Sequence, residues 1–132
     1  MEFMSQNYFK KLPVLITRPF NYTGLGHDEK FLIPKIVRAY KEGKKELELG
    51  NLEISREFND VRDICVMYRK LLGSNLEHEA VNLCSGKTIS LMQIIEMMDG
   101  ISGYKMNISI NPKFVRSNEI KVLSGSTFKL KS

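Results

Sequence analysis

The sequence predicts an α/β fold built on parallel strands. One observation is the short apolar run at residues 13–18, which begins at Pro13 and is followed by Pro19. Such a run is typical of a strand buried on both faces of a parallel sheet. A second apolar run at residues 80–84 is a candidate neighbour for it. Amphipathic segments lie between and beyond these two runs, as they do in α/β proteins.

Three of the amphipathic segments are predicted to be helices. Residues 61–72 follow Asp60, a suitable N-cap, and stop at Gly73. Ser90 and Gln93 have the spacing of a capping box, which predicts a helix from 91 to Gly100. Residues 31–42 form the third helix if Pro34 lies in its first turn. The apolar stripe of the first of these helices consists of Val61, Ile64, Cys65, Tyr68, Leu71 and Leu72.

The remaining segments give weaker signals. Residues 46–49 alternate apolar and charged side chains, which indicates a strand with one exposed face. Residues 1–11 resemble the end of a helix, with Met1, Met4 and Tyr8 on one face, and residues 126–132 resemble the start of a capped helix. Both ends therefore look truncated. No linker or repeat interrupts the chain, so we expect no domain boundary within it.

Composition narrows the class of protein without choosing a ligand. The formal charge of +5 arises from 20 basic and 15 acidic residues, which suits either an anionic ligand or a polyanion. The basic residues are scattered, so no stripe for nucleic acid is evident. No apolar run is long enough to span a bilayer and no signal peptide is present, so we expect a cytoplasmic protein without membrane contact. Cys65 and Cys84 lie in apolar surroundings and are interpreted as small buried hydrophobes.

The motifs of several enzyme classes are missing. Gly24-Leu25-Gly26 is the nearest match to a glycine-rich dinucleotide loop, but it lacks the third glycine and is interpreted as a turn. No P-loop, H-E-x-x-H, C-x-x-C or G-x-S-x-G sequence is present, so metal-dependent and serine hydrolase chemistry have no support. His27 and His78 are isolated and are interpreted as solvated loop residues.

Polar and basic residues at the ends of the apolar elements are the candidate ligand contacts. Asn21 follows the first strand, where its amide could donate to a phosphate oxygen or form an Asx-turn. Arg56 precedes a predicted helix, and its guanidinium could bind a diphosphate or form a surface ion pair. Arg116 has the same two interpretations. Lys35 is a candidate ligand contact only in combination with these residues.

Four motifs together resemble a known family. In order, they are Arg-Pro-Phe-Asn-x-x-Gly from Arg18, Arg-Glu-Phe-x-x-Val-x-Asp from Arg56, Val-Asn-Leu-x-Ser-Gly from Val81, and Arg-x-x-Glu from Arg116. This arrangement resembles the extended short-chain dehydrogenase/reductase superfamily. Residues 18–24 and 111–119 are most similar to the GDP-mannose 4,6-dehydratases and the GDP-4-keto-6-deoxymannose reductases.

The resemblance implies roles for the candidate residues, in an NAD(P)-dependent dehydratase, reductase or epimerase that acts on a nucleotide sugar. Asn21 would contact the diphosphate of the substrate, and Lys35 would lie against its base or phosphate. Arg56 and Arg116 would clamp the diphosphate, and Glu119 would accept hydrogen bonds from ribose hydroxyls.

The cofactor and the catalytic groups are expected to belong mainly to the parent enzyme. The backbone around Pro19 and Phe20 would meet the nicotinamide end of NAD(P). The glycine-rich loop and the catalytic Tyr-x-x-x-Lys motif are expected upstream of Met1, missing from this chain. We therefore expect residues 1–132 to be a C-terminal, substrate-binding portion, inactive alone and unable to hold NAD(P) tightly. Its fold would comprise the last strands of a partial Rossmann-type sheet and the small substrate-binding α/β subdomain.

Two further expectations concern partners. The main alternative is a non-catalytic module that binds nucleotide diphosphates or RNA through its positive charge. A parallel sheet without its central strands also leaves unpaired edges, so we expect the chain to associate with itself.

Overall fold

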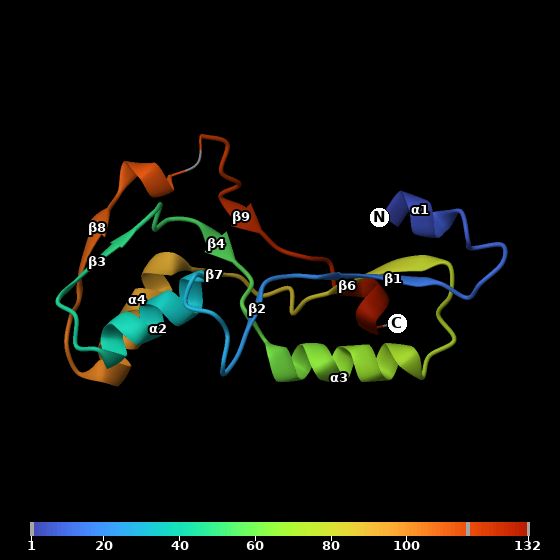
Figure 1. Cartoon of the computed structure of the whole chain (residues 1–132), viewed down its shortest axis with the longest axis horizontal. Coiled ribbons are helices and arrows are strands. Elements are labelled where there is room, and N and C mark those ends of the chain that lie inside the picture. The colour runs from blue at the N-terminus through green and yellow to red at the C-terminus, as the bar shows by residue number, and fades with distance from the viewer. Residues whose placement is uncertain (1, 116, 132) are drawn as a thin grey trace. The chain divides into compact units, whose positions relative to one another are not determined.

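The computed structural model describes residues 2–115 and 117–131, which form a mixed α/β fold with parallel strands (Figure 1). The chain divides into two compact units. The first unit contains Met1–Tyr22, Glu57–Lys87 and Ser124–Ser132, and the second contains Thr23–Arg56 and Thr88–Leu123. The chain passes repeatedly between the units, and the expectation of a single portion over residues 1–132 stays a prediction. Each unit is assembled from separate segments, so no single linker marks the division.

The first unit is built on two parallel strands, β1 (Leu15–Pro19) and β6 (Glu79–Leu83). Their register runs from Leu15 opposite Glu79 to Pro19 opposite Leu83. Helix α3 (Val61–Leu72) lies alongside them (Figure 1). The buried cluster that joins helix and strand consists of Ile64, Leu71, Val81 and Leu83, and it is extended by Leu15, Met67, Leu76 and Leu130.

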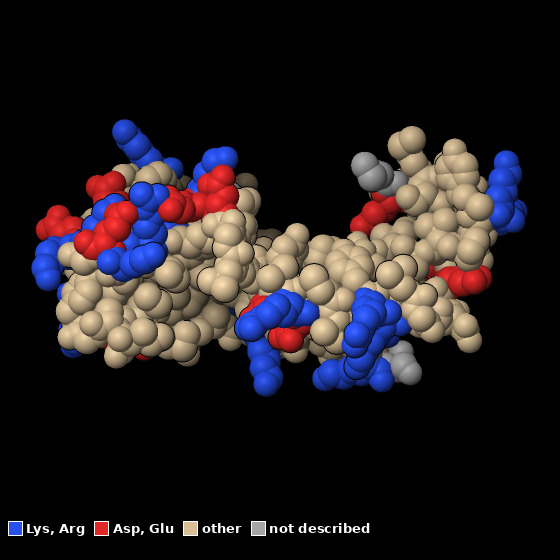
Figure 2. Space-filling view, turned by 60° about the horizontal axis from the view of Figure 1, so that its bottom comes forward, with Lys and Arg blue, Asp and Glu red and all other residues tan. Residues whose placement is uncertain are grey.

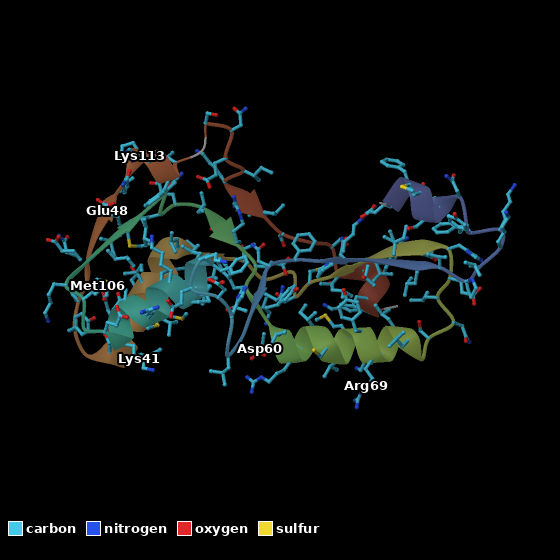
Figure 3. All side chains as sticks on the ribbon, viewed as in Figure 1. Lys41, Glu48, Asp60, Arg69, Met106 and Lys113 are labelled. Carbon is cyan, nitrogen blue, oxygen red and sulfur yellow. The ribbon has the colours of Figure 1, made fainter. Side chains whose placement is uncertain are left out.

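Helix α3 begins and ends at the predicted residues. Asp60 is the N-cap, and its carboxylate accepts a hydrogen bond of 2.8 Å from the backbone N–H of Arg62. Gly73 is the C-cap, and Arg69 lies in the last turn. Figure 3 labels Asp60 and Arg69 on this helix. An acidic group at the start of a helix and a basic group near its end both interact favourably with the helix dipole and stabilise the helix.

The buried face of α3 differs from the predicted stripe. Ile64 and Leu71 are buried as expected, but Cys65 is exposed and Leu72 is 87% exposed. Met67 packs on the core instead. The spacing of Ile64, Met67 and Leu71 is the i, i+3, i+7 pattern of a single helix face. The second cysteine, Cys84, is buried as predicted.

Strand β1 is less buried than its sequence predicts. Ile16 is buried, whereas Arg18 and Pro19 are exposed. Burial of a strand on both faces requires packed elements on both sides of its sheet. Within the described residues β1 pairs only with β6, so this small sheet also leaves one edge of β1 unpaired. Around this sheet lie the short helices α1 (Glu2–Gln6) and α5 (Phe128–Lys131), of which α1 is shorter than the predicted segment 1–11.

The second unit pairs β3 (Glu46–Leu49) with β8 (Asn107–Ile110) in parallel. Strand β3 alternates exposed glutamates with buried leucines, as predicted. Helices α2 (Leu32–Lys41) and α4 (Leu91–Ser102) pack against each other. Pro34 lies in the first turn of α2, and the Ser90–Gln93 capping box is formed. Helix α4 continues past the predicted stop at Gly100 and ends at Gly103, which adopts a left-handed φ of 76°.

Very short strands complete the fold. In the second unit β4 (Ser55–Arg56) lies between β7 (Ile89–Ser90), which is antiparallel to it, and β9 (Val122–Leu123), which is parallel. Strand β2 (Tyr22–Thr23) pairs with β5 (Asn59–Asp60). A 3₁₀ turn, η1 (Pro112–Phe114), follows β8. None of the helices within residues 2–115 and 117–131 is long and apolar enough to cross a membrane.

The unpaired edge of β1 generates a prediction about association. We expect the 132-residue chain to form oligomers, because strand pairing by another copy would satisfy the outer backbone groups of β1. The exposed side chains of Phe3 and Met4 on α1 would add apolar contact. Light scattering over a range of concentrations would measure this. A monodisperse monomer throughout the range would contradict it.

Candidate functional site

Lys35 is held in the second unit by two contacts. Its ammonium group donates a hydrogen bond of 3.0 Å to the backbone carbonyl of Glu48 at β3. The same nitrogen lies 4.9 Å from the centre of the Phe114 ring, within the range of a cation–π interaction. Neither contact neutralises the charge, so Lys35 remains a cation beside η1.

Gly50 explains how the chain after β3 approaches η1 so closely. A Cβ atom added at Gly50 would lie 2.8 Å from the backbone oxygen of Phe114. Backbone atoms cannot yield as a flexible side chain can, so any larger residue would push Phe114 away. The position of Phe114 over Lys35 therefore depends on a glycine at 50.

Arg56 lies on the central strand of the β7–β4–β9 sheet. Its guanidinium donates to the backbone carbonyl of Ser55 at 2.9 Å and, more weakly, to that of Lys121 at 3.4 Å. The backbone N–H of Ser55 also donates to the Lys121 carbonyl at 2.7 Å. Because no carboxylate in the described residues pairs with Arg56, its charge is available to an anion.

A single segment connects the surroundings of these two cations. Phe114 at its start contacts Lys35, and Lys121 near its end contacts Arg56. Glu119 lies between them, and its Oε2 atom is buried without a hydrogen-bond partner among the described residues. Arg116 belongs to the same segment but lies outside the described residues, so its predicted role stays a prediction.

The other predicted contacts belong to the first unit. Asn21 and Pro19 are exposed, and Phe20 is half-buried. The backbone carbonyl of Asn21 accepts hydrogen bonds from the N–H and the side-chain amide of Asn59, at 2.9 and 3.1 Å. The predicted convergence of Asn21 with Lys35 and Arg56 stays untested, since these residues belong to different units.

The sequence assigned no role to Glu57, yet its carboxylate accepts five hydrogen bonds from described residues of the first unit. It is 1% exposed. Its Oε2 atom accepts from the backbone N–H groups of Ser85 at 2.8 Å and Gly86 at 3.2 Å, and from the Ser85 hydroxyl at 3.1 Å. Its Oε1 atom accepts from the N–H of Gly125 at 2.6 Å and the hydroxyl of Ser124 at 3.2 Å.

These donors determine the charge of Glu57. Burial alone would raise its pKa, but the backbone N–H groups of Gly125, Ser85 and Gly86 stabilise the carboxylate, and the pKa lies below its ordinary value. Glu57 is therefore an ionised buried group whose neutralisation comes from hydrogen-bond donors. No basic side chain takes part in that hydrogen-bond set.

The close packing around Glu57 also requires a glycine. A Cβ atom at Gly125 would lie 2.7 Å from the sulfur of Cys84 and 2.8 Å from the ring of Phe20. Residue 125 thus passes between two side chains while its N–H reaches the carboxylate. The desolvation of Cys84 and the nearby charge of Glu57 raise the pKa of the Cys84 thiol, so this cysteine is an inert packing residue.

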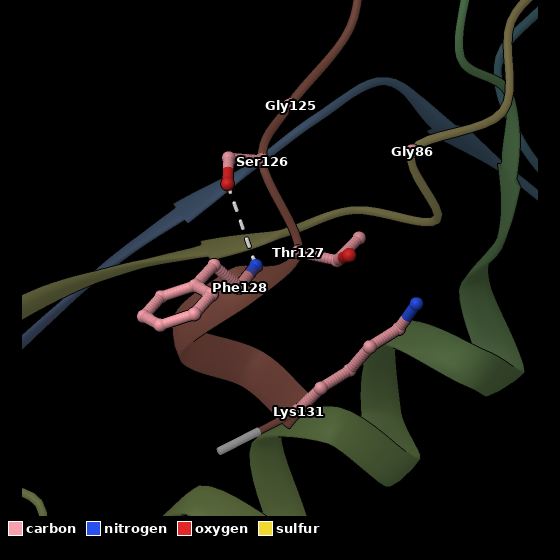
Figure 4. A pocket seen from close by; sticks show the side chains of 6 residues that line it. All are labelled: Gly86, Gly125, Ser126, Thr127, Phe128 and Lys131. Carbon is pink, nitrogen blue, oxygen red and sulfur yellow. Dashed lines mark hydrogen bonds between the residues drawn. The ribbon is translucent and has the colours of Figure 1, made fainter.

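A shallow pocket lies in the same unit and is lined by Gly86, Gly125, Ser126, Thr127, Phe128 and Lys131. Figure 4 shows the Lys131 side chain extending toward Thr127, with the Ser126 hydroxyl bonded to the backbone N–H of Phe128. Phe128 is 78% exposed. The pocket is open to solvent and its lysine is not positioned by any buried group, so we assign it no ligand.

A Tyr-x-x-x-Lys spacing does occur within the chain, at Tyr40 and Lys44, so the expectation that it is missing is wrong. Its surroundings differ from those of a proton-transferring tyrosine. Tyr40 is buried and its hydroxyl donates to Asp99 at 2.6 Å. Burial and this bond raise the pKa of Tyr40, opposite to what a general base requires. The Lys44 ammonium pairs with Glu42.

The two histidines differ in exposure. His78 is exposed, as predicted, whereas His27 is half-buried and stacks on Phe31 with ring centres 4.2 Å apart. Within residues 2–115 and 117–131, no group of histidine, cysteine and acidic side chains could hold a metal ion. On the face shown in Figure 2, basic side chains are interspersed with acidic ones.

The mixed α/β fold with parallel strands belongs to a class of protein, the extended short-chain dehydrogenase/reductases. Residues 1–132 match the family described as GDP-mannose 4,6 dehydratase, and the chain belongs to that family. A curated relative, GDP-6-deoxy-D-talose 4-dehydrogenase from Aggregatibacter actinomycetemcomitans, is 37% identical over 130 residues. The alignment covers 98% of this chain and 44% of the relative.

Solved structures agree with this assignment. A crystal structure from Burkholderia cenocepacia J2315, provisionally named an epimerase, is 43% identical, with a TM-score of 0.95 over 99% of this chain and 43% of its own. The structure of RMD from Pseudomonas aeruginosa complexed with NADPH is 29% identical, with a TM-score of 0.87 over 98% of this chain and 45% of its own. The chain thus spans less than half the length of these proteins, and the predicted family and fold class are confirmed.

The approach of Gly50 to Phe114 generates a stability prediction. We expect Gly50→Ala to lower the free energy of unfolding by about 1–3 kcal/mol, because the new methyl group would clash with backbone. The matched control is Gly100→Ala on α4, where a Cβ meets nothing within 4 Å and should be neutral or stabilising. Urea denaturation measures both. Equal effects of the two variants would contradict the account.

The ionised state of Glu57 generates a prediction about acid. Because its folded-state pKa is lowered, Glu57 contributes stability above its unfolded pKa, and this is lost as pH falls through the folded value. Below an ordinary carboxyl pKa of about 4, the wild-type chain should therefore lose stability faster than a Glu57→Gln variant. Urea midpoints measured from about pH 7 to about pH 3 would test this. Parallel pH profiles for the two proteins would show that Glu57 is not the responsible group.

Proposed function

We propose that this chain is the substrate-binding portion of an NAD(P)-dependent enzyme that acts on a nucleotide sugar, with a GDP-sugar as the favoured class. The proposal rests on the second unit, where one segment joins the surroundings of two uncompensated cations, Lys35 and Arg56. Two findings support the choice of substrate class. The chain belongs to the family described as GDP-mannose 4,6 dehydratase, and it is 37% identical to a GDP-sugar dehydrogenase.

The chemistry of a nucleoside diphosphate suits these residues. A diphosphate carries negative charge spread over several oxygens, and a guanidinium fork can donate two parallel hydrogen bonds to it. Arg56 already directs one nitrogen to backbone carbonyls, which fixes the orientation of the group. Arg116 would supply the second guanidinium of the clamp, and the predicted role of the Asn21 amide is to donate to a phosphate oxygen.

Glu119 suits the ribose of the nucleotide. Its Oε2 atom is buried without a partner among the described residues, which is unfavourable for a carboxylate unless a donor arrives. Two ribose hydroxyls are such donors. Lys35 and Phe114 together offer a cation and an aromatic face, to which the base or a phosphate could bind.

The fit of this chain to NAD(P) is limited to a few backbone atoms. Pro19 has no N–H, and the N–H of Phe20 is bonded to the carbonyl of Leu83 at 3.0 Å. The carbonyl oxygens of these two residues are therefore the groups that could accept from the carboxamide of a nicotinamide. These two carbonyls would orient the cofactor, which supplies hydride chemistry when bound. They could not hold the cofactor by themselves.

The same limits apply to catalysis. Tyr40 and Lys44 are not arranged for proton transfer, so the acid/base of the reaction would come from outside residues 1–132. We therefore expect this chain to bind substrate without turnover. Whether the whole enzyme dehydrates, reduces or epimerises depends on groups beyond this chain.

Calorimetry with GDP-mannose tests the proposal. Arg56→Ala should weaken binding about tenfold or more, the value of one charge-assisted hydrogen bond. The matched control is Arg62→Ala, which removes the same charge from an exposed arginine already paired with Asp60. That control should leave the affinity within about twofold, because exposed ion pairs contribute little.

Three outcomes would contradict the proposal. Equal losses in Arg56→Ala and Arg62→Ala would indicate nonspecific attraction. Salt-sensitive binding of a short RNA that ignores Arg56→Ala would instead favour a nucleic-acid module. No binding of GDP-mannose by the wild-type chain would leave the site without its proposed ligand.

A further inference from the structure

Glu57 directly follows the proposed ligand residue Arg56 in the chain, and its hydrogen bonds reach well beyond its own neighbours in sequence. Ser85 and Gly86 lie shortly before β7, while Ser124 and Gly125 directly follow β9. Strand β4 ends at Arg56, and Glu57 comes next. The carboxylate therefore bonds to the segment before β7 and to the segment after β9, while Glu57 itself directly follows β4.

The ladder between β4 and β9 is short, whereas the residue before β4 is also bonded to the start of α4, where the Leu91 N–H donates to the Ile54 carbonyl at 3.2 Å. Each of β4, β7 and β9 contains two residues. A ladder this short makes few backbone hydrogen bonds, and pairs of such strands are marginal by themselves. A buried carboxylate that accepts three backbone N–H groups near the ends of these strands adds bonds stronger than those of the ladder. Loss of that carboxylate would free the segments that enter and leave the sheet.

We propose that Glu57 is a positioning residue for nucleotide-sugar binding, in which its buried carboxylate fixes the strand that carries Arg56 against the strand that follows Lys121. Glu57 touches no ligand in this proposal. It acts through the bonds of Ser55 and Arg56 to the Lys121 carbonyl, which hold the guanidinium in place. This inference rests on the proposed function for its ligand, and on the described residues for its geometry.

Substitution by glutamine gives the sharpest variant. In Glu57→Gln the new amide would present an NH₂ group to backbone N–H donors, so at least one donor would lose its acceptor. Asp60→Asn is the matched control, because Asp60 is also an acidic residue close to the start of α3 and asparagine is an equally good cap. If Glu57→Gln does not fold, Ser124→Ala removes a single donor at 3.2 Å and should have a smaller effect in the same direction.

The first measurement needs no ligand. Amide hydrogen exchange of the Ser55 N–H, which bonds to the Lys121 carbonyl, should become at least about tenfold faster in Glu57→Gln if the β4–β9 pairing loosens. The Asn111 N–H, which bonds to the Leu49 carbonyl in the same unit, should keep its rate in the same sample. An unchanged Ser55 rate, or equal acceleration at both amides, overturns the positioning role whatever the chain binds.

The second measurement is a double-mutant cycle on GDP-mannose affinity. Glu57→Gln should weaken binding about tenfold in the wild-type background and by less than about twofold in the Arg56→Ala background, because it acts through Arg56. An equal loss in both backgrounds overturns the inference while leaving the proposed function intact. If the wild-type chain binds no GDP-mannose, the proposed function fails, and the exchange measurement alone decides the role of Glu57.

Discussion

One buried negative charge joins three separate segments of the first unit. Glu57 is removed from water, and such a carboxylate is unfavourable unless hydrogen-bond donors replace its hydration. Here the donors are backbone N–H groups and two serine hydroxyls from segments that are distant in the sequence. The need to satisfy this charge therefore specifies which loops meet. The need for donors also accounts for Gly125, whose N–H reaches the carboxylate through a space too narrow for a side chain.

The second unit also relies on a small number of contacts. One segment, from Phe114 to Lys121, contacts both cations of the candidate site. Gly50 lets that segment approach β3, and the short strand β9 returns it to β4 beside Arg56. The charges of Lys35 and Arg56 are oriented by backbone carbonyls, which leave them uncompensated. Such an arrangement suits an anionic ligand better than an internal ion pair would.

Local features were predicted well from the sequence because their causes are local. The caps of α3, the Ser90 capping box and the alternation of β3 each depend on residues close together in the chain. The buried face of α3 was assigned incorrectly, since Met67 and Cys65 are both compatible with a helical stripe and only packing chooses between them. The division into two units follows from contacts between distant segments, which leave no local signal in the sequence.

The candidate site was predicted in part. The family resemblance assigns roles to Lys35 and Arg56, and these roles stay predictions. Glu57 lies inside the same pattern but has no recognisable role there. Its partners are mainly backbone groups, and backbone donors leave no signature in a sequence. The Tyr40–Lys44 spacing shows the opposite case, in which the sequence matches a motif but the structure does not suit its chemistry. The Tyr40 hydroxyl is bonded to Asp99, and the pKa of Tyr40 is raised.

The central claim is the proposal that the second unit binds a nucleotide sugar, with Arg56 on the diphosphate and Lys35 beside the base or a phosphate. Its most direct test is a ¹H–¹⁵N NMR titration of the 132-residue chain with GDP, followed at backbone amides and arginine side chains. The account predicts that the largest shifts fall on Lys35, Arg56 and residues 114–121. Shifts confined to the first unit, around Thr127 and Lys131, would contradict it.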